Sequence, residues 1–152
     1  VYFVGTKLAN ANFSGANLTD ASIGDMVAGA NFSNAVIRGA TVWGLSKAQI
    51  YSTASYQTGD LTGIYFYSSQ TNWNFAGKNL TGATFQWAVD MSNSSFAGAN
   101  LTDAYLSYVS FQNANLSNAD LTGADLSYSK LTGANFTGAD VRGANLDPIG
   151  HT

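Results

Sequence analysis

Few side chains in this sequence could do chemistry, and two acidic residues offer the first possibility. Asp120 and Asp140 stand twenty residues apart in a region where the sequence repeats regularly. If the repeat places them side by side on one face, their carboxylates could bind a cation or share a proton. The alternative, which we expect, is that each carboxylate bonds to nearby backbone and to water.

Nucleophilic catalysis has no support in the sequence. The only histidine, His151, is the penultimate residue, and the chain has no cysteine. No Ser–His–Asp or Cys–His arrangement can therefore be assembled. We predict a protein that is not an enzyme, with no catalytic residues, no cofactor and no metal.

The elements that must position the remaining residues follow from a repeat of five. From Phe96 to Leu146 a large apolar residue recurs at every fifth position, and a small residue, most often Ala, stands two positions before it. A period of five fits neither an α-helix nor a β-strand. Repetition at a fixed period predicts a solenoid, in which each repeat buries its apolar side by stacking on its neighbours.

The repeat resembles that of the pentapeptide-repeat family, whose motif reads A-[DN]-[LF]-[ST]-G. Segments 99–103 (Ala-Asn-Leu-Thr-Asp) and 119–123 (Ala-Asp-Leu-Thr-Gly) match it closely. The resemblance implies an all-β fold, a right-handed quadrilateral β-helix with four repeats to a coil and the large and small residues pointing inward. We expect residues 1–152 to form a single domain of this kind, with successive coils about 4.8 Å apart.

Residues 43–60 interrupt the repeat and predict a helical and loop insertion. Ser46 and Gln49 have the form of a capping box, with Leu45 and Ile50 as a hydrophobic staple. We predict one short helix near 46–54, from about 47 to 53, then a loop at 55–59. Its apolar face should lie on the outside of the tube. Segment 44–57 resembles inserts in exported bacterial pentapeptide-repeat proteins. The interpretation we favour is an insertion that covers one face of the tube and carries no activity.

The repeat is least regular between Leu61 and Met91. Trp73 and Lys78 occupy positions where a small inward residue belongs. Because an ammonium group cannot lie unpaired inside the tube, we expect the wall to open locally. The Lys78 amine should then reach solvent while its stem lies on Trp73 or on the insertion. One extra residue between Phe85 and Met91 predicts a bulge.

Aromatic residues supply the main candidate interaction site. With four repeats to a coil, Trp87, Tyr108 and Tyr128 take the same outward position on successive coils and form a column of exposed rings. Such a column could simply stack, contact a partner or another copy, or bind carbohydrate. Tyr65, Tyr67 and Tyr105 add rings elsewhere.

The repeat also generates sequons for N-glycosylation, because Asn precedes the large residue and Ser or Thr follows it. They begin at Asn12, Asn17, Asn31, Asn79, Asn93, Asn100, Asn115 and Asn135. Because the repeat motif itself contains the sequon, these sequons are weak evidence for N-glycosylation. An outward-facing Asn would nevertheless be accessible to glycosylation.

The composition excludes several classes of partner. The net charge of −3 and the six scattered Lys and Arg residues provide no basic stripe for nucleic acid. The gyrase-inhibitor branch of the family, which resembles DNA in shape and charge, has a strongly acidic surface and a C-terminal dimer helix that this sequence lacks. No apolar run is long enough to span a membrane.

The ends of the tube suggest a function. An open coil exposes unpaired backbone groups and apolar side chains, and a head-to-tail contact between copies does not close on itself. Val1, Phe3, Leu146 and Ile149 are the candidate end-to-end contacts. We expect a structural protein that stacks into an extracellular filament or surface element. The alternative is an exported, rigid scaffold that binds a protein or glycan through an outer face. The opening inside a repeat, without Met, favours a secreted chain whose leader has been removed; a trimmed chain is the alternative.

Overall fold

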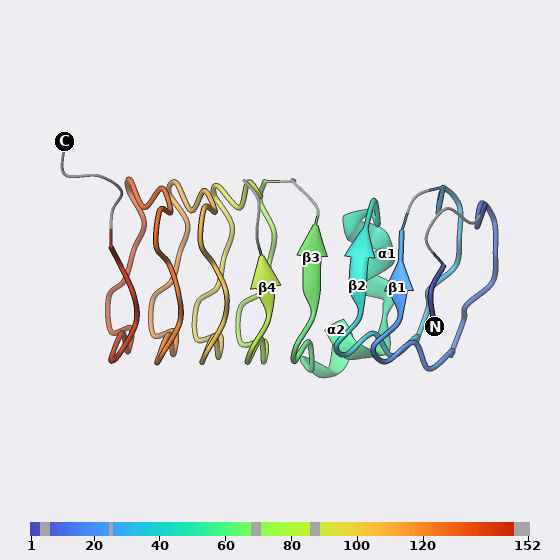
Figure 1. Ribbon diagram of the computed structural model, residues 1–152, viewed down its shortest axis with the longest axis horizontal. Helices are drawn as coiled ribbons and strands as arrows, with labels where there is room; N and C mark the ends of the chain where they lie inside the picture. The colour runs from blue at the N-terminus through green and yellow to red at the C-terminus, as the bar shows by residue number, and fades with distance from the viewer. Residues whose placement is uncertain (4–6, 25, 68–70, 86–88, 148–152) are drawn as a thin grey trace.

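The computed structural model is a long tube of stacked coils, and it describes residues 1–3, 7–24, 26–67, 71–85 and 89–147. The coils follow one another along the long axis in chain order (Figure 1). Each coil is therefore in contact only with the coil before it and the coil after it, as in other solenoids.

One wall of the tube contains the longest β-structure. β1 (Ser22–Ile23), β2 (Thr41–Trp43), β3 (Tyr65–Tyr67) and β4 (Thr84–Phe85) form a parallel four-stranded sheet in chain order. Parallel bridges from Tyr2 to Ser22 and from Thr84 through Tyr105 and Asp125 to Asn145 extend this row to both ends. Each coil contributes one segment to this row, and we call the row the first wall.

A regular coil shows how the other walls are built. Residues Tyr105, Ser110, Asn115 and Asp120 face outward on successive walls and pair in parallel with residues Asp125, Lys130, Asn135 and Asp140 of the next coil. The Leu106 N–H donates to the Asp125 carbonyl at 2.7 Å, and the Asp125 N–H donates to the Ala104 carbonyl at 2.9 Å. Four walls joined this way form the right-handed quadrilateral β-helix that the family resemblance implied.

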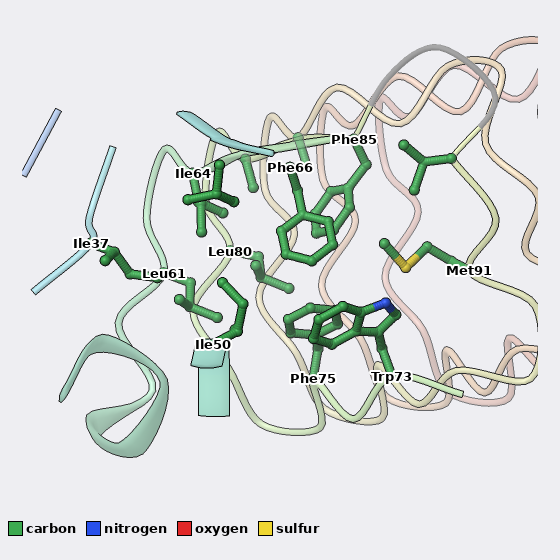
Figure 2. Packing of buried hydrophobic residues seen from close by; sticks show 14 of the residues in the cluster. Ile37, Ile50, Leu61, Ile64, Phe66, Trp73, Phe75, Leu80, Phe85 and Met91 are labelled. Atoms are coloured by element: carbon green, nitrogen blue, oxygen red, sulfur yellow. The ribbon is translucent and has the colours of Figure 1, made fainter. Parts of the chain in front are cut away.

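The large residues of the repeat fill the tube. Every fifth residue from Phe96 to Leu126 is at most 1% exposed, and the intervening Ala104, Ala114 and Ala124 are equally buried. Phenyl rings of successive coils pack on one another, with Phe75 and Phe96 stacked at 5.3 Å between centroids. Figure 2 shows this apolar interior around Phe66, Phe75 and Phe85. Each such ring contributes roughly 1.5–3 kcal/mol of burial free energy, before the chain entropy that opposes it.

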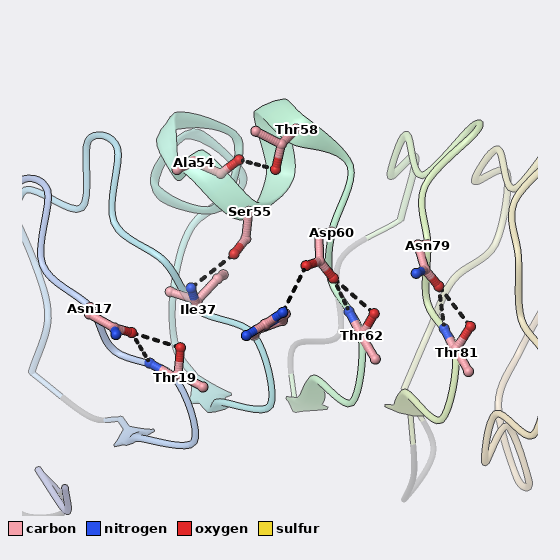
Figure 3. Close-up of polar contacts among 11 residues, drawn as sticks. Asn17, Thr19, Ile37, Ala54, Ser55, Thr58, Asp60, Thr62, Asn79 and Thr81 are labelled. Carbon is pink, nitrogen blue, oxygen red and sulfur yellow. Dashed lines mark hydrogen bonds and ion pairs between the residues drawn. The ribbon is translucent and has the colours of Figure 1, made fainter.

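The polar residues of the repeat stabilise the corners. The Asn79 side-chain oxygen accepts the Thr81 N–H at 3.1 Å and the Thr81 hydroxyl at 2.7 Å. Asn17 with Thr19 and Asp60 with Thr62 repeat this contact (Figure 3). Because Asn and Asp side chains can bond the backbone two residues on, they favour a turn at every corner.

The insertion forms two helices where one was expected. α1 (Lys47–Ser52) begins at the predicted capping box of Ser46 and Gln49. α2 (Ala54–Thr58) occupies the segment expected to be a loop. Thr53 ends α1 and also begins α2, because its hydroxyl accepts the Tyr56 N–H at 3.2 Å. The predicted loop at 55–59 was therefore wrong, apart from Gly59, which ends α2 in a left-handed conformation.

The position of the insertion also differs from the expectation. Ile50 is 0% exposed and belongs to the same buried cluster as Leu61 and Leu80. Figure 2 shows it pointing into the interior of the tube. The apolar face of α1 therefore lines the inside and not the outside. α1 and α2 replace parts of two walls in the coil that runs from β2 to β3.

The irregular segment agrees in part with the sequence. Trp73 is 1% exposed and lies inside the tube. The Lys78 amine lies 4.5 Å from the centre of the Tyr56 ring in α2. Lys78 therefore contacts the insertion, but with its amine, which was expected to reach solvent. The tube is not left open beside it, because the insertion covers that place. The predicted bulge between Phe85 and Met91 falls mainly on residues outside those described.

Candidate functional site

The acidic pair lies together as the repeat suggests but forms no shared site. Asp120 and Asp140 are directly bridged on neighbouring coils. Hydrogen bonds from Thr122 hold the pKa of Asp120 below its usual value, and bonds from Arg142 do the same for Asp140. The Arg142 guanidinium contacts the Asp140 carboxylate at 2.6 Å. Both acids are thus ionised near neutral pH and stabilise their own corners.

Side chains that could ligate a metal are not grouped into a site in the described part of the chain. In the described ranges no group of three or more His, Asp or Glu side chains is placed to hold a metal ion. His151 lies outside the described residues. Within the same ranges no helix is both long and apolar enough to cross a membrane.

The sequon asparagines lie on the outer surface, and the side-chain oxygens of all but Asn93 accept a hydrogen bond from the residue two positions on. Asn115 is half-buried and the other seven are exposed. In four of them, Asn17, Asn79, Asn100 and Asn135, the Thr hydroxyl of the sequon donates to the Asn oxygen at 2.7 Å. These contacts stabilise the corners, which is a structural reason for the residues to recur at these positions.

Two members of the predicted aromatic column meet. The Tyr108 and Tyr128 rings are stacked with centroids 4.7 Å apart and planes 11° apart. Their exposed fractions are 53% and 43%. Both have a φ of +62°, a left-handed conformation that costs an ordinary residue roughly 1–2 kcal/mol. Trp87, the third member, lies outside the described residues.

More rings lie near this column than the sequence indicated. The register of the first wall pairs Tyr65 with Thr84 and Thr84 with Tyr105, so these rings are not scattered elsewhere. At the ends of β2 and β3 on the same wall, Trp43 and Tyr67 are paired in register and their rings are stacked at 5.5 Å. We call this set the aromatic strip: Trp43, Tyr65, Tyr67, Tyr105, Tyr108 and Tyr128. Trp43 was missed because it is the first residue of segment 43–60, where the repeat cannot be counted.

The two ends of the described tube are apolar and incompletely covered. Val1 is 76% exposed, and Phe3 is half-buried against Phe13 with ring centroids 5.4 Å apart. At the opposite end Val141 and Leu146 are 38% and 41% exposed, although they occupy inward positions. Ile149 is outside the described residues. The predicted end contacts thus lie at opposite ends of one molecule (Figure 1).

The insertion bonds both neighbouring coils through side chains. Toward the earlier coil, the Gln49 amide donates to the Val27 and Ala30 carbonyls at 2.9 and 3.0 Å. The Ser55 hydroxyl accepts the Ile37 N–H at 3.0 Å (Figure 3). The Lys47 amine donates to the Thr71 carbonyl of the later coil. These bonds occupy backbone groups that a regular coil would otherwise pair.

Two tyrosines complete the contact with the later coil. The Asn74 N–H donates to the Tyr51 hydroxyl at 2.9 Å, and the Tyr56 hydroxyl donates to the Asn74 carbonyl at 2.6 Å. Burial and the neighbouring Tyr51 raise the pKa of Tyr56 to about 12. Nothing in the repeat signals these roles, because both rings come from the insertion.

Solved structures similar to this chain share low sequence identity with it. A pentapeptide repeat protein (Rfr23) from the cyanobacterium Cyanothece 51142 is 20% identical over 88% of this chain and 63% of its own, with a TM-score of 0.34. HetL from Nostoc sp. strain PCC 7120, involved in heterocyst differentiation regulation, is 25% identical over 95% of this chain and 59% of its own, with a TM-score of 0.30. The chain therefore spans about three-fifths of the length of these two proteins.

A third structure is that of QnrB1, a plasmid-mediated fluoroquinolone resistance protein. It is 18% identical over 84% of this chain and 75% of its own, with a TM-score of 0.27. No curated protein sequence is significantly similar to the chain.

The family itself is identified from sequence. The profile of the pentapeptide repeats matches residues 1–25, 88–123 and 114–147, with eight copies, and these ranges cover more than half of the chain. The residues between them include the insertion and the irregular segment, where the five-residue period is interrupted. On the match and the four-walled tube together, the chain belongs to the pentapeptide-repeat family.

Proposed function

We propose that this protein is a non-enzymatic structural protein whose tubes stack head to tail into an extracellular filament or surface element. The observation that supports it is the match between the unpaired backbone groups at the two ends. At one end the Phe136 and Val141 N–H groups have no partner among the described residues, although the equivalent Leu116 N–H donates to Asn135.

The other end offers the complementary groups. The Asn12 and Asn17 carbonyls accept no hydrogen bond from any described residue, whereas the equivalent Asn31 carbonyl accepts from Phe13. Every wall repeats the same donor and acceptor pattern, so the Phe136 end of one copy can continue the ladder into the Asn12 end of the next. Such a contact is heterologous and extends without closing.

Apolar surface at both ends favours the same contact. Phe136 is half-buried and Val141 is exposed at one end, and Phe3 and Phe13 are half-buried at the other. Stacking would bury these side chains as fully as Phe96 and Phe111 are buried inside the tube. Burial of that kind contributes about 25 cal/mol per Å² of apolar area.

The test is the assembly state of the 152-residue chain. We expect concentration-dependent growth in light scattering and rods longer than one tube in electron micrographs. Phe136→Asp places a carboxylate at the stacking end and should leave single short rods, whereas Thr132→Lys on the outer surface should assemble normally. A chain that stays monomeric at every concentration, or a Phe136→Asp variant that still forms filaments, contradicts the proposal.

The location outside the cell rests on the resemblance of segment 44–57 to inserts in exported bacterial family members. Fractionation of the source cells with an antibody to the protein tests it. Recovery from the cytoplasm alone would contradict an extracellular role without bearing on end-to-end stacking.

A second candidate function is a rigid scaffold that displays an outer face to a protein or a glycan. The observation that favours it is the strained geometry of the stacked Tyr108 and Tyr128. Residues held in a sparsely populated backbone conformation are concentrated at functional sites. This function does not require assembly, because the display face lies on the side of the tube.

A further inference from the structure

We infer that the aromatic strip binds an extended, uncharged polysaccharide of flat pyranose rings. The inference rests on the scaffold function proposed above and names its ligand; it does not depend on end-to-end stacking. The strip combines rings at fixed positions, few charges and a spacing that follows the coils.

The positions of the rings are fixed by the first wall. Tyr65 and Tyr105 flank Thr84 in the parallel register, so their backbones are two coil steps apart, about 9.6 Å. Both rings are about half exposed, at 44% and 54%. Because the backbone ladder sets this distance, the rings are positioned before any ligand arrives and lose little freedom on binding.

The ring spacing suits a polymer that repeats with two residues. In a β-1,4-linked pyranose chain each sugar is turned over relative to its neighbour, so the same face recurs at every second sugar. That distance is comparable with two coil steps. The C–H groups on the face of a pyranose carry partial positive charge, and the face of an aromatic ring is negative, so the two surfaces attract.

The charge of the strip favours an uncharged ligand. From Thr41 to Tyr128, the described residues of the first wall and its following corner include one charged side chain, Asp125. A nucleic acid would need cations along this face, and none is present among those residues. The polar neighbours are hydroxyls and amides, including Thr41, Ser107 and Asn145, which can bond sugar hydroxyls.

The backbone strain gives an independent reason to assign a role to this surface. Tyr108 and Tyr128 both keep a φ of +62° at a corner where Gly44, three coils before Tyr108, occupies the same position at φ +66°. Glycine or asparagine would occupy that conformation with less strain. Most other corners place Gly, Asn or Asp in this conformation, so the two tyrosines depart from the corner pattern, which supports a role for their rings in contact with a ligand.

The experiment measures retention of the full chain on insoluble cellulose and chitin, and titration with cellohexaose and chitohexaose, with α-linked dextran for comparison. We expect binding to at least one β-1,4-linked polymer and not to dextran. Tyr65→Ala and Tyr105→Ala should each weaken binding of the β-1,4-linked polymer about tenfold. Alanine substitution of an aromatic residue that stacks on a base has an effect of this size in single-strand binding proteins. Tyr105→Phe, which keeps the ring, and Gln112→Ala, on another wall, should bind normally.

Several results would overturn the inference. One is that the unsubstituted chain is not retained, and another is that it binds dextran as well as the β-1,4-linked polymers. A third is that the Tyr65→Ala and Tyr105→Ala variants, with unchanged thermal midpoints, are retained as well as the unsubstituted chain. The last is that the strip captures a protein partner in place of the glycan. The same titration with the Phe136→Asp variant separates the two proposals. Binding by this non-stacking variant supports the glycan site even if filaments never form, and filaments without binding remove only the glycan site.

Discussion

The hydroxyls of Tyr51 and Tyr56 take the place of the backbone groups that a regular coil would present to Asn74. Their rings are stacked at 4.3 Å, and their hydroxyls bond the N–H and the carbonyl of one residue, Asn74. In a regular coil these two groups pair with backbone, as the Asn115 N–H does with the Ser94 carbonyl and the Asn115 carbonyl with the Phe96 N–H. The pair therefore continues the ladder across a coil that is partly helical.

Removal of these hydroxyls should destabilise the fold. Tyr51→Phe and Tyr56→Phe each remove one hydrogen bond to the exposed backbone of Asn74, at a cost of about 0.5–1.5 kcal/mol. We expect the double variant to lose less than the sum, since both residues serve one contact. Urea unfolding measures this. Tyr65→Phe is the matched control, because the Tyr65 ring is exposed on the first wall, and an equal loss in that variant would contradict the assignment.

High pH should weaken the same contact. The pKa of Tyr56 is raised to about 12 from an ordinary value near 10, so folding favours its neutral form. Its contribution to stability is fully present below pH 10 and is lost as the pH rises through 12. Thermal midpoints between pH 9 and pH 12 should fall more steeply for the unsubstituted chain than for Tyr56→Phe. Parallel curves for the two proteins would exclude Tyr56 as the group responsible.

Corner glycines should differ in their tolerance of a methyl group. Gly77 and Gly123 both have positive φ, near +65° and +70°. An added Cβ at Gly77 meets nothing within 4 Å, whereas at Gly123 it collides with the Asp103 carboxylate. We expect Gly77→Ala to cost about 1–2 kcal/mol from backbone strain alone. Gly123→Ala should cost more, and equal denaturant midpoints for the two variants would show that Asp103 moves aside freely.

The tyrosines of the corner should be nearly dispensable for stability. Tyr108→Asn relieves roughly 1–2 kcal/mol of left-handed strain but loses a stacking contact with Tyr128 worth about 0.5–1.5 kcal/mol. The net change in unfolding free energy should therefore lie within about 1 kcal/mol of zero. Differential scanning calorimetry tests this. A loss of several kcal/mol would mean that the rings are part of the structural core and not of a display surface.

The regular coils could be predicted from the sequence because the position of a residue in the five-residue motif determines whether its side chain points inward or outward. Leu101 and Ala99 are both buried, as their positions in the motif require, and the capping box at Ser46 begins α1 as expected. The second helix could not be predicted, because five residues from Ala54 to Thr58 are too few to show a helical period. Only the fold reveals that Thr53 ends one helix and begins the next.

The placement of the insertion and of the aromatic strip depended on partners far away in the chain. Ile50 points inward because Tyr51 and Tyr56 are held by Asn74, which lies in the following coil and in an irregular repeat. Trp43 joins the strip through its stacking on Tyr67, and that register becomes known only when the coil containing the insertion closes. The five-residue period is interrupted by the helical insertion, so the sequence alone does not give the register between the repeats on its two sides.

The replacement of backbone by tyrosine hydroxyls also bears on how a filament would respond to pulling. Elsewhere the coils are joined by rows of main-chain bonds on every wall, but at the insertion part of that attachment passes through long, jointed side chains. Load applied along the axis should concentrate there, so each subunit would yield at the same place. A fibre of this protein would then lengthen by a set increment per subunit before it breaks.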